Sequence, residues 1–129
     1  MNLVWYVAVG SAVGGASRFV LSSFIQQRAG TFPVGTLIIN ITGSLILGFI
    51  MRYALGSTSV SAETRALLTT GFCGGYTTFS TFSYETIALL QTGDYRRGGV
   101  YVIMSVVLSL LATFIGIVAA GEMLAARTS

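Results

Sequence analysis

Four long apolar stretches fill most of this chain and constrain its fold more than any other feature. They cover about residues 3–25, 35–53, 66–90 and 98–123, with short polar connections between them. A helix needs about 20 predominantly apolar residues to cross a bilayer. The sequence therefore predicts an all-α integral membrane protein, a single domain over residues 1–129 with four transmembrane helices and no soluble domain.

The composition supports this class and excludes others. Hydrophobic residues make up 53% of the chain and charged residues 9%, whereas a soluble domain averages about 25% charged residues. Histidine is absent and there is one cysteine, which excludes an intramolecular disulfide and a Cys/His metal site. No basic cluster indicates nucleic acid, and without histidine or paired carboxylates we do not expect an enzyme. We interpret the N-terminal stretch as a first span, because no cationic region precedes it.

The third apolar stretch departs from an ordinary membrane helix. Residues 71–85 contain three glycines, then five Ser/Thr hydroxyls interleaved with Phe79 and Phe82, then Glu85. Polar groups at membrane depth are expensive and usually face a bundle interior or a water-filled path. The dense glycines predict a helix broken near its middle, around Gly74–Thr77, which lipid tolerates only where protein or a cavity covers the freed backbone. This segment is therefore predicted to line a route for something polar.

The first two spans carry small or polar faces at helical spacing. Gly10 and Gly14 form a small-xxx-small pair, which is typical of close helix packing. Arg18 continues that face, too deep to reach the membrane surface easily, so we expect it to bond backbone carbonyls or to reach an aqueous vestibule. In the second span Thr36 and Asn40 share a face. The Asn40 amide either joins two helices or offers its N–H groups to an anion.

Aromatic rings and hydroxyls mark the last two spans. Phe79 and Phe82 are three residues apart, and the positive edge of a ring can favour an anion; the alternative is ordinary core packing. A ladder of hydroxyls recurs four residues apart in the fourth span, at Tyr101, Ser105 and Ser109. Glu85 has three open interpretations: a carboxylate in the path, an interfacial residue, or a partner for an arginine.

The arginines do not decide the orientation of the chain. Four spans place three loop arginines on each side of the membrane, leaving out Arg18, whereas an excess of Lys/Arg normally marks the cytoplasmic side. Either one loop arginine dominates, or the chain inserts both ways and two copies pair as an antiparallel dimer. Four short helices enclose a polar path poorly, which independently favours an oligomer, and a two-fold pair is the commonest closed arrangement.

At these residues the chain resembles the Fluc (CrcB) family of small fluoride ion channels. The run from Gly74 to Glu85, Gly-Gly-Tyr-Thr-Thr-Phe-Ser-Thr-Phe-Ser-Tyr-Glu, is similar to the family signature almost residue for residue. Gly14-Gly15-x-x-Arg18, Gly35-Thr36-Leu37, Asn40 and the fourth-span ladder fit as well. The resemblance covers the whole chain, including its length and four-span layout.

The resemblance implies a channel for passive, electrodiffusive efflux of fluoride, which relieves fluoride toxicity inside the cell. It implies an antiparallel, dual-topology homodimer with two separate pores in the cytoplasmic (inner) membrane of a prokaryote. The expected partners are fluoride, the lipid bilayer and a second copy of the chain, without nucleic acid.

The resemblance also implies roles for individual residues. Arg18 would attract anions at a vestibule. A structural sodium ion would lie at the dimer axis, held by the backbone carbonyls of Gly74 and Thr77, which are hard oxygen ligands suited to a hard cation. The residues implied to line the fluoride pathway are Phe79, Phe82, Asn40, Thr81, Ser80, Tyr101, Ser105, Ser109 and Thr36.

Two other classes of membrane protein are weighed against this interpretation. A small multidrug exporter also has about four spans, but it needs a carboxylate embedded in its first span. This chain has Arg18 there and no acidic residue before Glu63. An accessory scaffold subunit would explain the small-residue faces but not the run of Thr, Ser and Phe in the third span.

Overall fold

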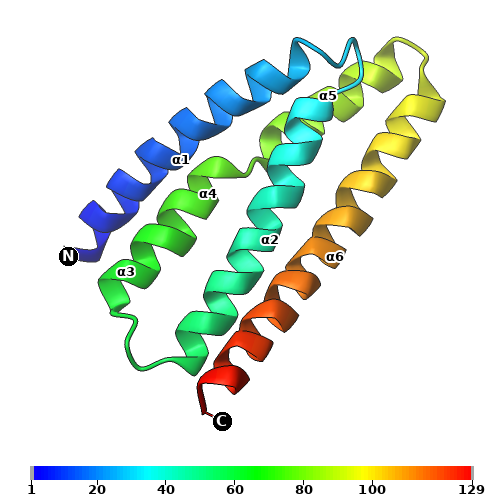
Figure 1. The fold of residues 1–129 in the computed structure, drawn as a ribbon. Helices are drawn as coiled ribbons and strands as arrows, with labels where there is room; N and C mark the ends of the chain where they lie inside the picture. The colour runs from blue at the N-terminus through cyan, green and yellow to red at the C-terminus, as the bar shows by residue number, and fades with distance from the viewer. Residues whose placement is uncertain (1, 129) are drawn as a thin grey trace.

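The computed structural model describes residues 2–128 as a set of helices joined by short connections (Figure 1). Segments α3, η1 and α4 follow one another without a gap, and η1 is a π-helical stretch. The elements in chain order are α1 (Asn2–Gln26), α2 (Val34–Gly56), α3 (Ala62–Ala66), η1 (Leu67–Cys73), α4 (Gly74–Tyr76), α5 (Phe79–Gln91) and α6 (Tyr95–Thr128).

Three of these helices, α1, α2 and α6, are long and apolar enough to cross a membrane. They coincide with the first, second and fourth predicted spans, and each is longer than predicted. The difference is largest for α6, which runs over 34 residues because the polar residues at both ends continue the helix. The third predicted span is divided among α3, η1, α4 and α5, the longest of which has 13 residues.

Large apolar side chains cover the outside of the molecule. Trp5, Phe19, Leu110 and Phe114 are each more than 60% exposed, on α1 and α6. A water-soluble monomer rarely exposes apolar surface on this scale. These helices therefore present the outer surface expected of a protein surrounded by lipid.

Helices α2 and α6 lie side by side along most of their length (Figure 1). Glycines make this close approach possible at two points. A Cβ added to Gly48 would collide with the carbonyl oxygen of Thr113, and one added to Gly116 would collide with that of Leu45. Small residues at such contacts let two helix backbones pack directly against each other.

Helix α1 packs in the same way against η1 and α4. A Cβ added to Gly10 would collide with the carbonyl oxygen of Leu67, and one added to Gly14 with that of Phe72. In return, a Cβ on Gly75 would lie 2.6 Å from the carbonyl oxygen of Ser11. The prediction that the first-span glycines serve helix packing is therefore confirmed, and Gly75 serves the same contact from the other side.

The helix break lies at the C-terminal end of the expected range, Gly74–Thr77, rather than at the glycines. Gly74 and Gly75 are helical, and the backbone becomes extended only at Thr77 (φ −81°, ψ 161°) and Thr78 (φ −152°, ψ 117°), before α5 begins. The glycine cluster was a misleading marker because a glycine can stay in a helix where a neighbouring backbone comes close. Contact with α1 therefore explains why residue 75 is a glycine. The helix is interrupted only after the glycines.

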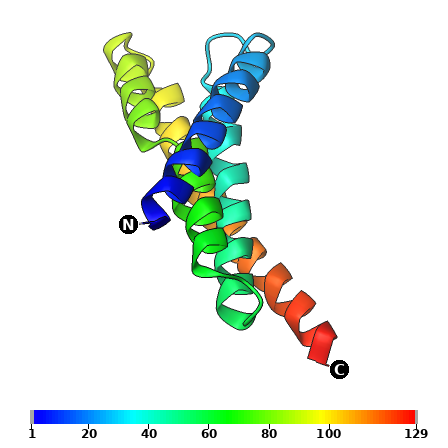
Figure 2. The same ribbon diagram turned by 90° about the vertical axis from the view of Figure 1, so that its left-hand side faces the viewer.

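Helix α5 lies apart from α1. At the end of the molecule that carries the α1–α2 and α5–α6 connections, the helices form two arms (Figure 2). One arm consists of α5 and the start of α6, and the other of α1 and the start of α2.

Gln26 holds the connection between α1 and α2 in place. Its Nε2 donates to the carbonyls of Gly30 and Phe32 at 2.8 and 2.9 Å. Its Oε1 accepts from the N–H of Gly35 at 3.1 Å.

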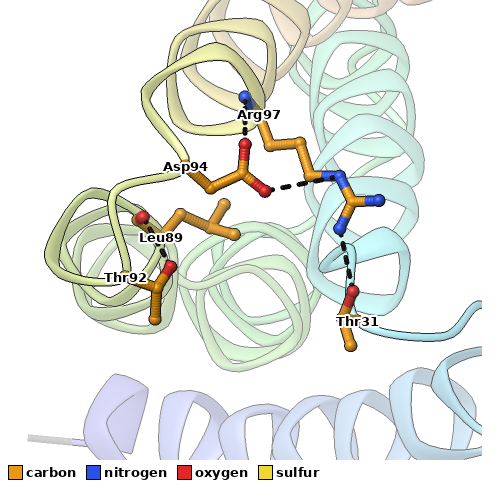
Figure 3. Close-up of polar contacts among 5 residues, drawn as sticks. All are labelled: Thr31, Leu89, Thr92, Asp94 and Arg97. Atoms are coloured by element: carbon orange, nitrogen blue, oxygen red, sulfur yellow. Dashed lines mark hydrogen bonds and ion pairs between the residues drawn. The ribbon is translucent and has the colours of Figure 1, made fainter.

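Arg97 joins the two connections (Figure 3). Its Nη1 donates to Thr31 Oγ1 at 3.0 Å, and its Nε lies 3.5 Å from Asp94 Oδ2. In the turn before α6, Thr92 Oγ1 donates to the carbonyl of Leu89 at 2.8 Å. The bond from Arg97 to Thr31 thus ties the α5–α6 connection to the α1–α2 connection.

Candidate functional site

Two cavities flank the extended segment between α4 and α5. The larger has a volume of about 340 Å³ and is lined from α2, α5, α6 and the extended segment. It brings together five of the residues implied to line the fluoride pathway: Asn40, Phe79, Phe82, Ser105 and Ser109. We call this space the phenylalanine cavity.

The two phenylalanines begin a row of aromatic rings. The centroids of Phe79 and Phe82 are 5.6 Å apart with their planes at 50°, and Phe82 lies 5.3 Å from Tyr101 at 48°. Phe32 meets Tyr101 edge to face at 5.7 Å. Phe79 is 79% exposed, whereas Tyr101 is fully buried. Tyr101 therefore packs against Phe82 from the protein interior. It is not among the residues that line the phenylalanine cavity.

Ser105 contributes an unused hydroxyl to this cavity. Its Oγ is the buried side-chain polar atom that has no hydrogen-bond partner within residues 2–128, and the residue is only 7% exposed. A buried polar group without a partner is costly. Ser105 is a lining residue of the phenylalanine cavity, so this unsatisfied hydroxyl lies next to that space. Ser109, one turn further along α6, lines the same wall.

Asn40 holds the extended segment in place. Its Oδ1 accepts from the N–H of Thr78 at 2.8 Å, and its Nδ2 donates to the carbonyl of the same residue at 3.0 Å. The amide thus satisfies both backbone groups of a residue that has left the helix. Of the two interpretations of Asn40, the one in which its amide joins two elements is observed. The Nδ2 group has a second N–H, which is not used in the bond to Thr78. The Asn40 side chain also lines the phenylalanine cavity.

The second cavity, of about 260 Å³, lies on the other side of the extended segment. We call it the arginine cavity, because Arg18 lines it together with Thr36, Thr78 and Thr81. Within residues 2–128 the guanidinium of Arg18 has no hydrogen bond or ion pair, so the expected bonds to backbone carbonyls are not found. Its charge therefore stands at this cavity without a counter-charge among the described residues.

Glu85 is bound by two hydroxyl groups. Thr36 Oγ1 donates to one of its carboxyl oxygens at 2.8 Å, and the hydroxyl of Tyr101 donates to the other at 2.7 Å. The ion pair found within the described residues joins Asp94 and Arg97, so Glu85 is not the partner of an arginine. The carboxyl links α2, α5 and α6. No local pattern indicates these bonds, because Thr36 and Tyr101 lie 49 and 16 residues from Glu85 along the chain.

Besides Tyr101, three predicted residues lie outside the walls of the two cavities or contribute to them only in part. Gly74 is exposed and lines neither cavity, and the nearest atom to an added Cβ would be the Thr69 carbonyl oxygen at 3.9 Å. Thr77 lines the phenylalanine cavity, while its N–H and hydroxyl both donate to the carbonyl of Cys73, at 3.0 and 2.9 Å. Ser80 is exposed, with its hydroxyl 3.3 Å from that of Thr78.

Thr78 is the residue that sequence reasoning did not single out. It is 8% exposed and is the one residue that lines both cavities. Its Oγ1 accepts from the N–H of Thr81 at 3.2 Å and donates to Thr81 Oγ1 at 3.0 Å. Thr is a common N-cap, the residue just before a helix, whose side chain accepts from an N–H up to three residues later. The position of Thr78 three residues before Thr81 was therefore the sequence feature that could have indicated this cap.

Comparison with known proteins places this chain in a family. The family model described as CrcB-like protein, Camphor Resistance (CrcB), matches residues 5–117. A protein of Aquifex aeolicus named fluoride-specific ion channel FluC is 44% identical over 117 residues, which cover 90% of this chain and 94% of that protein. Proteins with the same name from Rhizobium meliloti and Geobacter sulfurreducens are also 44% identical, covering 91% and 95% of this chain and 94% and 100% of their own length. With this similarity along nearly its whole length, the chain belongs to the CrcB family.

Proposed function

We propose that this protein is a fluoride-selective channel that mediates passive efflux of fluoride down its electrochemical gradient. The proposal starts from the relatives, whose names describe fluoride-specific ion channels. The observation that carries it to this chain is the phenylalanine cavity, where the ring pair, the Asn40 amide and the unused Ser105 hydroxyl converge.

The chemistry of these groups suits a small, strongly hydrated anion. Fluoride can give up water only if donors replace it step by step, and conduction needs several sites of modest strength rather than one tight site. The Ser105 hydroxyl, the spare Asn40 N–H and the ring edges of Phe79 and Phe82 offer such contacts in sequence. Arg18 lies in the other cavity, where it attracts anions without binding them inside the aromatic section.

An antiparallel homodimer completes the pathway in this proposal. Phe79 is 79% exposed and stands at a cavity that a single subunit leaves open on one side. The exposed Ser80 hydroxyl beside this ring is poorly suited to lipid contact, and a second copy would cover both residues. The equal numbers of loop arginines on the two sides of the membrane support insertion in both orientations, in the cytoplasmic membrane of a prokaryote.

A structural sodium ion at the dimer axis fits the residues present. Thr77 makes the last backbone hydrogen bond of its helical segment, to Cys73, and the last four carbonyls of a helix have no partner within it. The carbonyls of Gly74 and Thr77 are thus hard oxygen ligands at a helix C-terminus, where a cation is favoured. Two ligands from one subunit do not make a sodium site, so two copies would have to supply it together. The ion would hold the subunits at a fixed distance.

The test is ion release from liposomes that contain the purified protein. Fluoride and chloride electrodes are read in parallel, with valinomycin present to carry compensating potassium. Fast fluoride release with negligible chloride release supports the channel. A folded protein that releases neither ion would overturn the proposal and favour a scaffold role. Release that depends on a proton gradient would favour a coupled transporter.

A further inference from the structure

We propose that Thr78 is the passage between the two cavities, so that every anion crossing the subunit passes its hydroxyl group. This inference rests on the proposed channel function and adds a specificity-determining residue to it. The starting observation is that the phenylalanine cavity and the arginine cavity share one lining residue, Thr78.

The backbone of Thr78 is fixed on both sides. The Asn40 amide binds its N–H and its carbonyl at 2.8 and 3.0 Å, so the residue cannot rotate about its backbone without breaking both bonds. Its extended conformation between α4 and α5 holds the side chain at the boundary between the two spaces. The backbone of Thr78 is therefore fixed between the two cavities, and its hydroxyl group is the part that can reorient.

The hydroxyl group is held but can be exchanged. Thr78 Oγ1 donates its one hydrogen to Thr81 Oγ1 at 3.0 Å, and it also lies 3.3 Å from Ser80 Oγ. A hydroxyl has one donor and can rotate about its C–O bond. An anion arriving from either cavity can take this hydrogen from Thr81, and Thr81 takes it back when the anion leaves. The exchange replaces one hydrogen bond by another, which suits fast passage.

The same atom has a second task, which the experiment must separate from the first. Thr78 Oγ1 accepts from the N–H of Thr81 at 3.2 Å and so caps α5. A residue that served only as a cap would be replaced well by Ser or Asp, both of which are good caps. A residue that anions pass would tolerate Ser but not Asp, because a carboxylate repels the anion and has no hydrogen to donate.

The experiment compares fluoride release from liposomes for the wild type, Thr78→Ser, Thr78→Asp and Thr78→Val. We expect Thr78→Ser to stay within about threefold of the wild type. Thr78→Val keeps the shape but loses the donor, and we expect about tenfold slower release, the upper range for one neutral hydrogen bond. Thr78→Asp should release fluoride at least about a hundredfold more slowly while its unfolding temperature stays near that of Thr78→Ser.

Two controls match these changes. Ser61 caps α3 through its Oγ, which accepts from the N–H of Thr64 at 3.1 Å, on an exposed surface away from both cavities. Ser61→Asp should therefore leave fluoride release unchanged. Thr86→Val removes a hydroxyl that donates to the Phe82 carbonyl within α5, and it should also be silent.

The outcomes separate the two proposals. A wild type that releases no fluoride overturns the channel itself. A wild type that conducts, with Thr78→Asp folded and equally active, shows that Thr78 is only a cap. If Thr78→Val does not fold, the comparison of Thr78→Ser with Thr78→Asp still decides, since both keep the cap. Equal fluoride release from these two variants overturns the inference.

Discussion

The side-chain amide of Asn40 binds both the N–H and the carbonyl of Thr78, at 2.8 and 3.0 Å. These two backbone groups lie where the chain has left the helix, and they would otherwise be unpaired at membrane depth. The pairing gives Asn40 a structural task beside any contact with an anion.

Replacing Asn40 separates these two tasks. Asn40→Leu leaves the N–H and the carbonyl of Thr78 buried without partners, at a cost of about 1–3 kcal/mol for each group, so the unfolding temperature in detergent should fall clearly. Asn40→Asp keeps an acceptor for the N–H of Thr78 but loses the donor and adds a negative charge, so fluoride release should be blocked. Wild-type release by a folded Asn40→Asp protein would remove Asn40 from the path.

The ring edges of Phe79 and Phe82 can be removed one at a time. We expect Phe79→Ile or Phe82→Ile to slow fluoride release about tenfold or more, because an aliphatic group has no positive edge to offer an anion. Assembly should persist, since an apolar side chain of similar volume replaces each ring. The matched control is Phe114→Ile on the outer face of α6. Unchanged release from both pathway variants would contradict the proposal of ring-edge contacts.

Two glycines of α6 give opposite predictions for stability. Gly116→Ala places a methyl group against the carbonyl oxygen of Leu45, so α2 and α6 must move apart, and we expect a loss of about 1–3 kcal/mol. Gly99 has nothing within 4 Å of an added Cβ, and Gly99→Ala should be neutral or gain up to about 1 kcal/mol, because alanine favours the helix. Thermal unfolding in detergent measures both, and equal unfolding temperatures would contradict the packing described for α2 and α6.

Gly74 and Gly75 distinguish contacts within a subunit from contacts between subunits. A methyl group on Gly75 lies 2.6 Å from the Ser11 carbonyl oxygen, so Gly75→Ala should lower the unfolding temperature of the subunit. A methyl group on Gly74 has ordinary space, with its nearest neighbour at 3.9 Å. We expect Gly74→Ala to fold normally yet to shift the mass measured by light scattering from dimer toward monomer. A fully dimeric Gly74→Ala protein would argue against close approach of two copies at this glycine.

Hydropathy alone predicted α1, α2 and α6, because a membrane span needs only length and apolar composition. The exact position of the helix interruption was not predictable, since glycine marks both helix breaks and close helix packing, and here Gly75 serves packing. The interruption falls instead at Thr77 and Thr78.

The candidate site was predictable as a set of residues but not as an arrangement. Polar and aromatic residues in apolar spans are conspicuous, and Asn40, Phe79, Phe82, Ser105 and Ser109 do meet in one cavity. Which atoms pair is decided by contacts between residues distant in sequence, such as Asn40 with Thr78. No local pattern specifies such a pairing, so the role of Thr78 as a shared wall could be found only in three dimensions.

Helix α6 has a consequence for how the molecule sits in its surroundings. Its 34 residues give a length of about 51 Å at about 1.5 Å per residue, whereas the hydrocarbon layer is about 30 Å thick. Tilt alone would have to exceed about 40°, the upper end of the range for membrane helices. One or both ends of α6 must therefore stand in the head-group layer or beyond it. There Arg127, whose guanidinium hydrogen-bonds to the Tyr53 hydroxyl, is placed to meet lipid phosphates, so the bilayer itself would help to set the height of the pathway.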